Sequence, residues 1–255
     1  MKITFLGTGT SQGIPVINCN CIVCTSKNLK DNRLRSSVWI QTERNSFVID
    51  IGPDFRQQAL KNSITRVDAL FITHEHADHT AGLDDIRPIN FSMGKKIPLY
   101  TESRVIEDLK KRFYYVFGES DYPGLPQLEL FEIESNKRVY INEDIVLPIR
   151  ISHGKLDILG FKIQDFVYIT DAKFISDEAI QQMKGCKILV LNALRHKEHH
   201  SHLSLAQAIE MINKIKPETA FLTHISHQLG LHDEVEKSFN ENVFLAYDGL
   251  AIQCQ

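Results

Sequence analysis

The chain has 255 residues, a hydrophobic content of 43% and a formal net charge of −3. Its length suits one large domain over residues 1–255, and its composition supports a substantial core. The slight acidity gives no general attraction to nucleic acid or to an anionic membrane. No apolar run approaches the ~20 residues that span a bilayer, and the first residues do not resemble a signal peptide. We therefore expect a cytoplasmic protein whose cysteines are thiols or metal ligands rather than disulfides.

Strand-like and helical segments alternate along the chain. The apolar patterns predict strands over residues 3–6, 37–41, 47–51, 69–73, 99–101, 127–132, 145–152, 161–164, 166–170, 188–192, 220–223 and 243–245. Helices are predicted over residues 54–61, 79–87, 104–117, 177–183, 205–215 and 233–239. Several strand runs are almost continuously apolar, as in strands buried on both faces. The order predicts an α/β fold with two sheets between helical layers.

The segment 73–79, directly after the apolar run 67–72, carries four potential metal ligands: His74, His76, Asp78 and His79. Imidazole nitrogen and carboxylate oxygen are typical ligands of zinc-like dications. This spacing gives ligand pairs that point in different directions, which is enough to begin two adjacent metal sites. A histidine-rich surface loop is the alternative, and the position behind a buried strand disfavours it.

Later strand-like runs also end in possible ligands. His153 follows residues 145–152, Asp171 follows residues 166–170, and His224 follows residues 220–223. Junctions between strands and loops are places where a rigid scaffold positions functional side chains. Each residue alone is a weak signal. With the first cluster they make seven candidates, which is the number that two adjacent ions sharing one carboxylate need.

These residues, in this order, resemble the ligand pattern of the metallo-β-lactamase superfamily. The match includes Asp50 in the segment 48–52 and spans most of the chain, from Phe5 to Asp248. The resemblance implies a four-layer αββα sandwich in which Asp50 orients a ligand histidine. It implies one metal held by His74, His76 and His153, a second held by Asp78, His79 and His224, and Asp171 bridging the two.

A second cluster contains Cys19, Cys21 and Cys24. Three thiolates at this spacing need a fourth ligand to complete a tetrahedral zinc site, and three unrelated thiols are the alternative. The cluster and the Gly-rich segment 7–15 together resemble the PhnP-type phosphodiesterases of the same superfamily. That resemblance implies a structural zinc whose fourth ligand is His227, three residues beyond His224.

The chemistry expected of such a site is ester hydrolysis. Two dications about 3.5–4 Å apart lower the pKa of a bridging water and stabilise an oxyanion in displacement reactions. The resemblance to phosphodiesterases implies that His202 protonates the departing alkoxide, with Asp78 as a further catalytic residue. Capping of the helix over residues 205–215 is the alternative role for His202. The expected substrate is a small phosphodiester, cyclic ones included.

The expected cofactors are two divalent metals in the active site, zinc or manganese with iron as a third option, and one structural zinc. We expect a small-molecule partner and neither a membrane nor nucleic acid; the sequence leaves open whether the chain forms a homodimer. Two other functions remain open: a non-catalytic metal-bearing carrier of a small metabolite, and a nuclease similar to tRNA 3′-processing enzymes. The aromatic, Gly- and Pro-containing segment 114–126 is either a surface loop or a lid over the metals.

Overall fold

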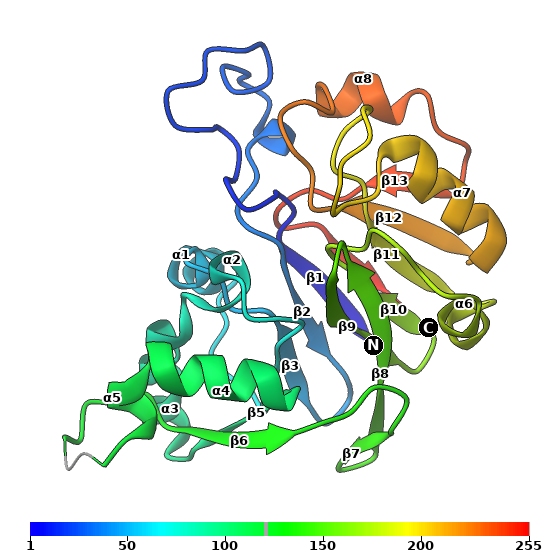
Figure 1. Ribbon diagram of the computed structural model, residues 1–255. Helices are drawn as coiled ribbons and strands as arrows, with labels where there is room; N and C mark the ends of the chain where they lie inside the picture. The colour runs from blue at the N-terminus through cyan, green and yellow to red at the C-terminus, as the bar shows by residue number, and fades with distance from the viewer. Residues whose placement is uncertain (120–121, 255) are drawn as a thin grey trace.

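The computed structural model describes residues 1–119 and 122–254. Within these ranges two seven-stranded sheets pack face to face, and helices cover the outer face of each sheet (Figure 1). This is the four-layer αββα sandwich that the sequence predicted. No helix in the described part of the chain is both long and apolar enough to cross a membrane.

The first sheet contains, in spatial order, β14 (Ala251–Gln253), β1 (Lys2–Gly7), β2 (Ser37–Gln41), β3 (Ser46–Ile49), β4 (Ala69–Phe71), β5 (Ile97–Thr101) and β6 (Leu128–Glu132). The pairs from β14 to β3 are antiparallel and those from β3 to β6 are parallel. Its helices are α1 (Phe55–Lys61), α2 (Ala77–Thr80), α3 (Arg87–Met93), α4 (Ser103–Arg112) and α5 (Tyr114–Phe117). Two short 3-10 turns, η1 (Leu29–Asp31) and η2 (Leu83–Ile86), lie in the connections.

The second sheet contains, in spatial order, β13 (Val243–Leu245), β12 (Thr219–Thr223), β11 (Ile188–Asn192), β10 (Phe166–Tyr168), β9 (Leu156–Ile163), β8 (Asp144–His153) and β7 (Val139–Ile141). The pairs from β7 to β10 are antiparallel and those from β10 to β13 are parallel. The helices on this side are α6 (Asp177–Met183), α7 (Leu205–Ile215) and α8 (His232–Glu236). Both sheets therefore change from antiparallel to parallel pairing along their width.

The apolar core of the described residues forms three clusters, one at each contact between layers. Phe47 and Ile49 of β3 belong to the cluster between the sheets, whereas Val48 between them packs under the helices of the first sheet. Successive side chains of a strand point to opposite faces, so one strand contributes to two clusters. This burial on both faces explains why the central strands read as continuous apolar runs.

Some predicted elements differ from the structure. The region predicted as one helix over residues 79–87 contains α2, η2 and the start of α3. Pro88 lies in the first turn of α3, a position that favours the beginning of a new helix. The helix predicted over residues 104–117 ends at Arg112, because Phe113 leaves helical geometry with ψ at 42°. The strand predicted over residues 161–164 is the end of the longer β9, whose Gly160 interrupts the apolar pattern. Both β7 and β14 were missed.

Candidate metal centre

The seven ligands predicted from the sequence converge at one end of the sandwich, where strands of both sheets end. His74 and His76 follow β4, Asp78 and His79 lie in α2, and His153 ends β8. Asp171 follows β10 and His224 follows β12. Within each of these groups the ligand atoms lie no more than 4.8 Å apart: His74, His76 and His153; His74, His79 and Asp171; Asp78, His79 and His224; His153, Asp171 and His202.

The first group consists of three imidazoles. His74 Nε2 lies 2.9 Å from His76 Nδ1, and the ring of His153 lies 5.3 Å from that of His76. Nδ1 of His153 faces the carbonyl oxygens of Asp171 and Ser201, each at 2.8 Å. A proton on Nδ1 therefore satisfies both carbonyls and leaves Nε2 unprotonated, which is the state in which an imidazole binds a metal.

The second group joins carboxylates to imidazoles. His79 Nε2 lies 3.2 Å from Asp78 Oδ2 and 3.3 Å from Asp171 Oδ2. His224 Nδ1 lies 3.2 Å from the same Asp171 oxygen. His79 Nε2 is buried and makes no hydrogen bond among the described residues. A divalent cation at this point would satisfy that orphaned nitrogen and both carboxylates, so the residues present fit a metal.

Asp50 holds His79 in place from behind. Its Oδ2 lies 2.7 Å from His79 Nδ1, and its Oδ1 accepts the backbone N–H of Thr73 at 2.9 Å. Asp50 and His79 are fully buried, so the hydrogen bond fixes both the ring orientation and the tautomer of the imidazole. The orienting role that the resemblance implied for Asp50 matches this geometry.

The charges of the site are strongly coupled. Burial opposes protonation of His79, but the carboxylates of Asp78, Asp50 and Asp171 raise its pKa well above the usual value. Burial favours the neutral form of Asp171, but His224 and His79 lower the pKa of its carboxyl group well below the usual value. These opposite shifts have one cause, the attraction between the buried imidazoles and the carboxylates around them.

Three residues of the site have left-handed backbone conformations: Asp50 with φ 63°, Asp171 with φ 56° and His224 with φ 54°. Residues other than glycine rarely adopt this region, and each instance costs roughly 1–3 kcal/mol. At these three positions a strand ends and the side chain turns toward the common point. Residues held in such conformations are found at functional sites.

Three threonines that the sequence analysis did not assign also contact the ligands, and the first is Thr73, whose Oγ1 lies 2.9 Å from His74 Nδ1. Thr170 Oγ1 donates to Asp171 Oδ2 at 2.7 Å, and Thr10 Oγ1 lies 3.1 Å from His224 Nε2. Thr10 belongs to the Gly-rich segment 7–15, which was noted only for its resemblance. Thr170 directly precedes its ligand in sequence, as Thr73 precedes His74. This repeated Thr–ligand order was the one sequence signal that could have indicated these contacts.

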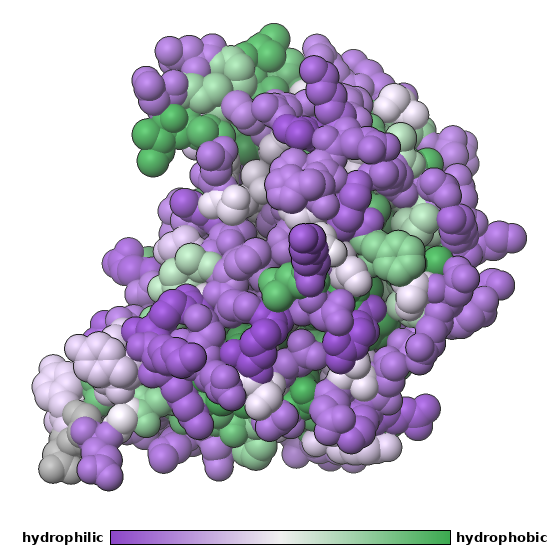
Figure 2. Space-filling model, viewed as in Figure 1, coloured by the Kyte–Doolittle hydropathy of each residue, from purple (hydrophilic) through white to green (hydrophobic). Residues whose placement is uncertain are grey.

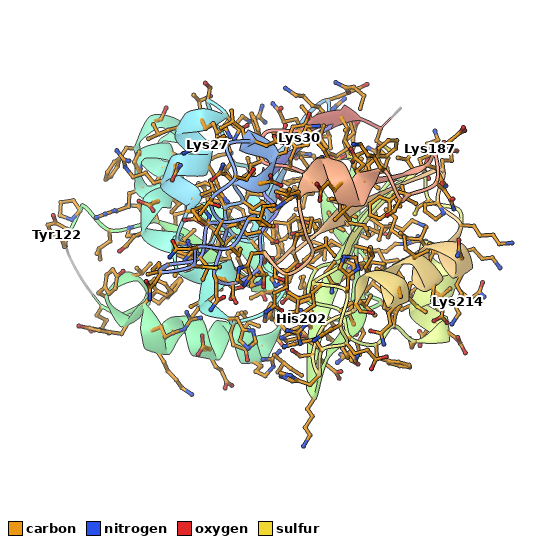
Figure 3. The ribbon with its side chains drawn as sticks, turned by 90° about the horizontal axis from the view of Figure 1, so that it is seen from above. Lys27, Lys30, Tyr122, Lys187, His202 and Lys214 are labelled. Atoms are coloured by element: carbon orange, nitrogen blue, oxygen red, sulfur yellow. The ribbon has the colours of Figure 1, made fainter. Side chains whose placement is uncertain are left out.

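His202 lies at the rim of the cluster, near the boundary between the two halves of the sandwich (Figure 3). Its Nδ1 lies 3.5 Å from Asp171 Oδ1 and makes no hydrogen bond within the described ranges. Burial and the neighbouring His224 lower the pKa of His202 to about 3. Helix α7 is capped by Ser204, in a reciprocal pair with Gln207, so capping does not explain His202.

The cysteine cluster forms a separate site on the segment between β1 and β2. Nδ1 of His227 lies 3.3, 3.4 and 3.5 Å from the sulfur atoms of Cys19, Cys21 and Cys24. All three cysteines are free thiols. The backbone N–H of Cys24 and the ring of His227 lower the pKa of Cys21 to about 6. Three sulfurs and one imidazole within 4.8 Å of one another suit a tetrahedral zinc.

The segment 114–126 extends away from the metal centre. Figure 3 shows Tyr122 at the far edge of the first half, well separated from His202. The hydroxyl of Tyr115 donates to Asp84 Oδ2 at 2.7 Å, which ties α5 to the 3-10 turn η2. Residues 120 and 121 lie outside the described ranges. In this conformation the described part of the segment, α5 and the residues after it, lies at the surface and does not cover the ligands.

Comparison with known proteins identifies the family. The model of the beta-lactamase superfamily domain matches residues 45–225, which include every candidate active-site ligand. A solved diphosphatase from the PhnP family is 37% identical, with a TM-score of 0.92 over 98% of this chain and 96% of that one. Ribonuclease Z of Borreliella burgdorferi is 23% identical over 92% of this chain and 96% of its own length.

An octanoyltransferase of Porphyromonas gingivalis is 41% identical over 98% of this chain. The chain spans only about half, 51%, of that relative's length. The family of the present chain follows instead from the superfamily model over residues 45–225 and from the 37% identical structure, which is matched over nearly its whole length. The fold and the convergent histidines and aspartates agree with this result, and the chain belongs to the beta-lactamase superfamily and, within it, to the PhnP family.

Proposed function

We propose that the protein is a phosphodiesterase that hydrolyses small phosphodiesters, cyclic ones included, at a site for two divalent metals. The observation that carries the proposal is the position of Asp171. Its carboxylate lies against His79 and His224 on one side and His202 on the other, and its backbone carbonyl faces His153. A carboxylate in this position can be shared between two adjacent cations.

In this proposal the first metal position is formed by His74, His76 and His153, the second by Asp78, His79 and His224, with Asp171 between them. Zinc or manganese suits this mixture of imidazole and carboxylate, with iron as a third option. When bound, the metals supply an activated water nucleophile and neutralise charge that develops on the substrate. Asp50 keeps Nε2 of His79 turned toward the second position.

His202 is the proposed general acid. With a pKa of about 3 its imidazole is neutral at pH 7 in the metal-free site. A negatively charged phosphodiester bound beside the ring raises that pKa, because opposite charges favour the protonated form. The ring then takes a proton from solvent and donates it to the departing alkoxide.

Hydrolysis at phosphorus is favoured by the PhnP-family relative, whose name is that of a diphosphatase. Acyl ester or thioester hydrolysis is the second candidate, and the 41% identity to part of an octanoyltransferase supports it. A nuclease similar to ribonuclease Z is less well supported, since the identity is 23% and the net charge of −3 gives little attraction for RNA.

We also propose a structural zinc held by Cys19, Cys21, Cys24 and His227. A site with four protein ligands has no open position for water or substrate. The ion would join the segment between β1 and β2 to the loop after β12. Because His224 lies in the same loop, three residues before His227, the zinc would also support the rim of the active site.

The test compares metal-loaded and metal-free protein on two substrates. We expect the zinc- or manganese-loaded protein to hydrolyse bis(p-nitrophenyl) phosphate, and to hydrolyse p-nitrophenyl octanoate far more slowly. Faster hydrolysis of the octanoate would favour the acyl hydrolase. Absence of turnover of either substrate by protein with both active-site metals bound would contradict the phosphodiesterase and leave the metal-bearing carrier.

A further inference from the structure

The turn between the first two ligand histidines is held from outside by helix α4. Arg112 donates to the carbonyl oxygen of Glu75 at 2.7 Å and to Thr80 Oγ1 at 3.0 Å. Arg104 pairs with the carboxylate of Glu75 through Nη1 and donates through Nη2 to the carbonyl oxygen of Asp157 at 2.8 Å. One guanidinium therefore joins this turn to strand β9.

The two acceptors of Arg104 belong to opposite sheets. Glu75 follows β4 of the first sheet, whereas Asp157 lies in β9 of the second sheet. In the register of β8 and β9, Asp157 is opposite Ser152, the residue before His153. Arg104 thus connects the turn that carries His74 and His76 to β9, the strand that pairs with the one ending at His153.

The ligands of this position are not equally constrained. His74 is fully buried, and the carbonyl of the residue before it accepts the backbone N–H of Leu159 across the sheets at 3.0 Å. His76 is exposed and lies in the turn itself. Oε2 of Glu75 is buried without a hydrogen-bond partner among the described residues, so the position of this carboxylate depends on its pairing with Arg104.

We propose that Arg104 is a positioning residue. It keeps His76 at the correct position relative to His153 and so raises the affinity of the first metal position for its ion. The inference rests on the two-metal assignment proposed above. Residues that orient metal ligands typically change metal affinity about 10–100-fold when they are replaced. The second position takes its ligands from α2 and from the ends of β10 and β12, none of which Arg104 contacts.

The experiment measures zinc affinity rather than activity. The full chain is stripped of active-site metal, and zinc is titrated in competition with a chromophoric chelator to give two dissociation constants. His76→Ala shows which of the two binding steps in the titration belongs to the first metal position, and His224→Ala shows which belongs to the second. Arg104→Ala should weaken the first step about 10–100-fold and change the second less than about twofold.

Arg104→Lys tests the geometry of the connection. Its ammonium retains the charge but lacks the rigid fork that reaches two acceptors at once, so the first step should again weaken. Glu75→Gln in the Arg104→Ala background should add little further loss, because the pair has already been broken. Lys110→Ala, an exposed position on the same helix, is the matched control and should leave both steps unchanged.

The outcomes separate this inference from the proposed function. If His76→Ala abolished the first step while Arg104→Ala left it unchanged, the positioning role would be wrong and the two-metal assignment would stand. Equal weakening of both steps by Arg104→Ala and Arg104→Lys would indicate a general structural role and would also overturn the inference. If His76→Ala removed neither step, the assignment of the first metal position would itself be wrong.

Discussion

The two clusters of metal-ligating residues are positioned by different means. In the histidine–aspartate cluster, His79, Asp171 and His224 are at most 2% exposed and lie in or next to elements of the packed sandwich. In the cysteine cluster the ligands are only partly buried, and their segment has little regular structure beyond η1. The packed sandwich positions the histidine–aspartate ligands. The cysteine-bearing segment has no such packing, so its ligands and their metal must stabilise the segment.

The surface of the cysteine-bearing segment supports this distinction. Ile17, Ile22 and Leu29 are 95%, 70% and 83% exposed, and Figure 2 shows a hydrophobic patch over this segment at the top of the molecule. Side chains that remain in solvent contribute no burial energy to fold the segment. We infer that metal at the cysteine cluster maintains structure, and that metal at the histidine–aspartate cluster supplies chemistry.

The strongest test of the catalytic half of this comparison removes the shared carboxylate. Asp171→Asn keeps the shape of the side chain and tolerates the left-handed backbone better than alanine does, but it loses the charge that both metal positions need. We expect hydrolysis of bis(p-nitrophenyl) phosphate to fall to the level of metal-free protein, with an unchanged circular dichroism spectrum. Near-full activity with both metals retained would show that Asp171 is not shared.

A smaller effect is expected from His202→Ala. If His202 is the general acid, the variant should lose about 10²–10⁴-fold in rate on phosphodiesters with poor alkoxide leaving groups. It should lose little with p-nitrophenolate, which departs without a proton. His199→Ala, in the same loop, is the control and should behave like the parent on both substrates. Equal slowing of both substrates by His202→Ala would instead assign His202 to substrate positioning.

Metal removal should distinguish the two clusters directly. Mild chelation should remove the active-site metals and the activity while about one zinc per chain remains, because a closed four-ligand site resists extraction. Elemental analysis before and after chelation measures this. Recovery of fewer than three metals from freshly purified protein, with none dependent on the cysteines, would contradict the structural zinc.

The smallest effect is expected from breaking the cysteine cluster. Cys21→Ser should release that zinc, expose the segment 16–28 to proteolysis and lower the melting temperature by roughly 4–8 °C if about 2 kcal/mol is lost. Activity should fall less than in Asp171→Asn, because the ligands of the active site remain. Ile22→Ser, an exposed neighbour, should keep the zinc. Unchanged proteolysis of zinc-free Cys21→Ser would show that the segment folds without metal.

Much of this protein could be predicted from its sequence. Central strands are buried on both faces and are therefore apolar without interruption, so their sequence pattern predicts them. The ligands that directly follow these strands could be predicted for the same reason. Edge strands such as β7 and β14 are short and partly exposed, so no pattern marked them. The helix predicted over residues 79–87 was wrong, because α2 ends at Thr80 and the next α-helix, with Pro88 in its first turn, begins only at Arg87.

Which ligands share an ion was implied by family resemblance, and whether they meet was decided by the tertiary structure. Residues as far apart as His76 and His153 approach each other only because two sheets pack face to face, and local sequence does not encode that distance. The same holds for Arg104, which reads as an ordinary cation on an amphipathic helix. Its two acceptors lie on opposite sheets, so its connection exists only once the sandwich has formed.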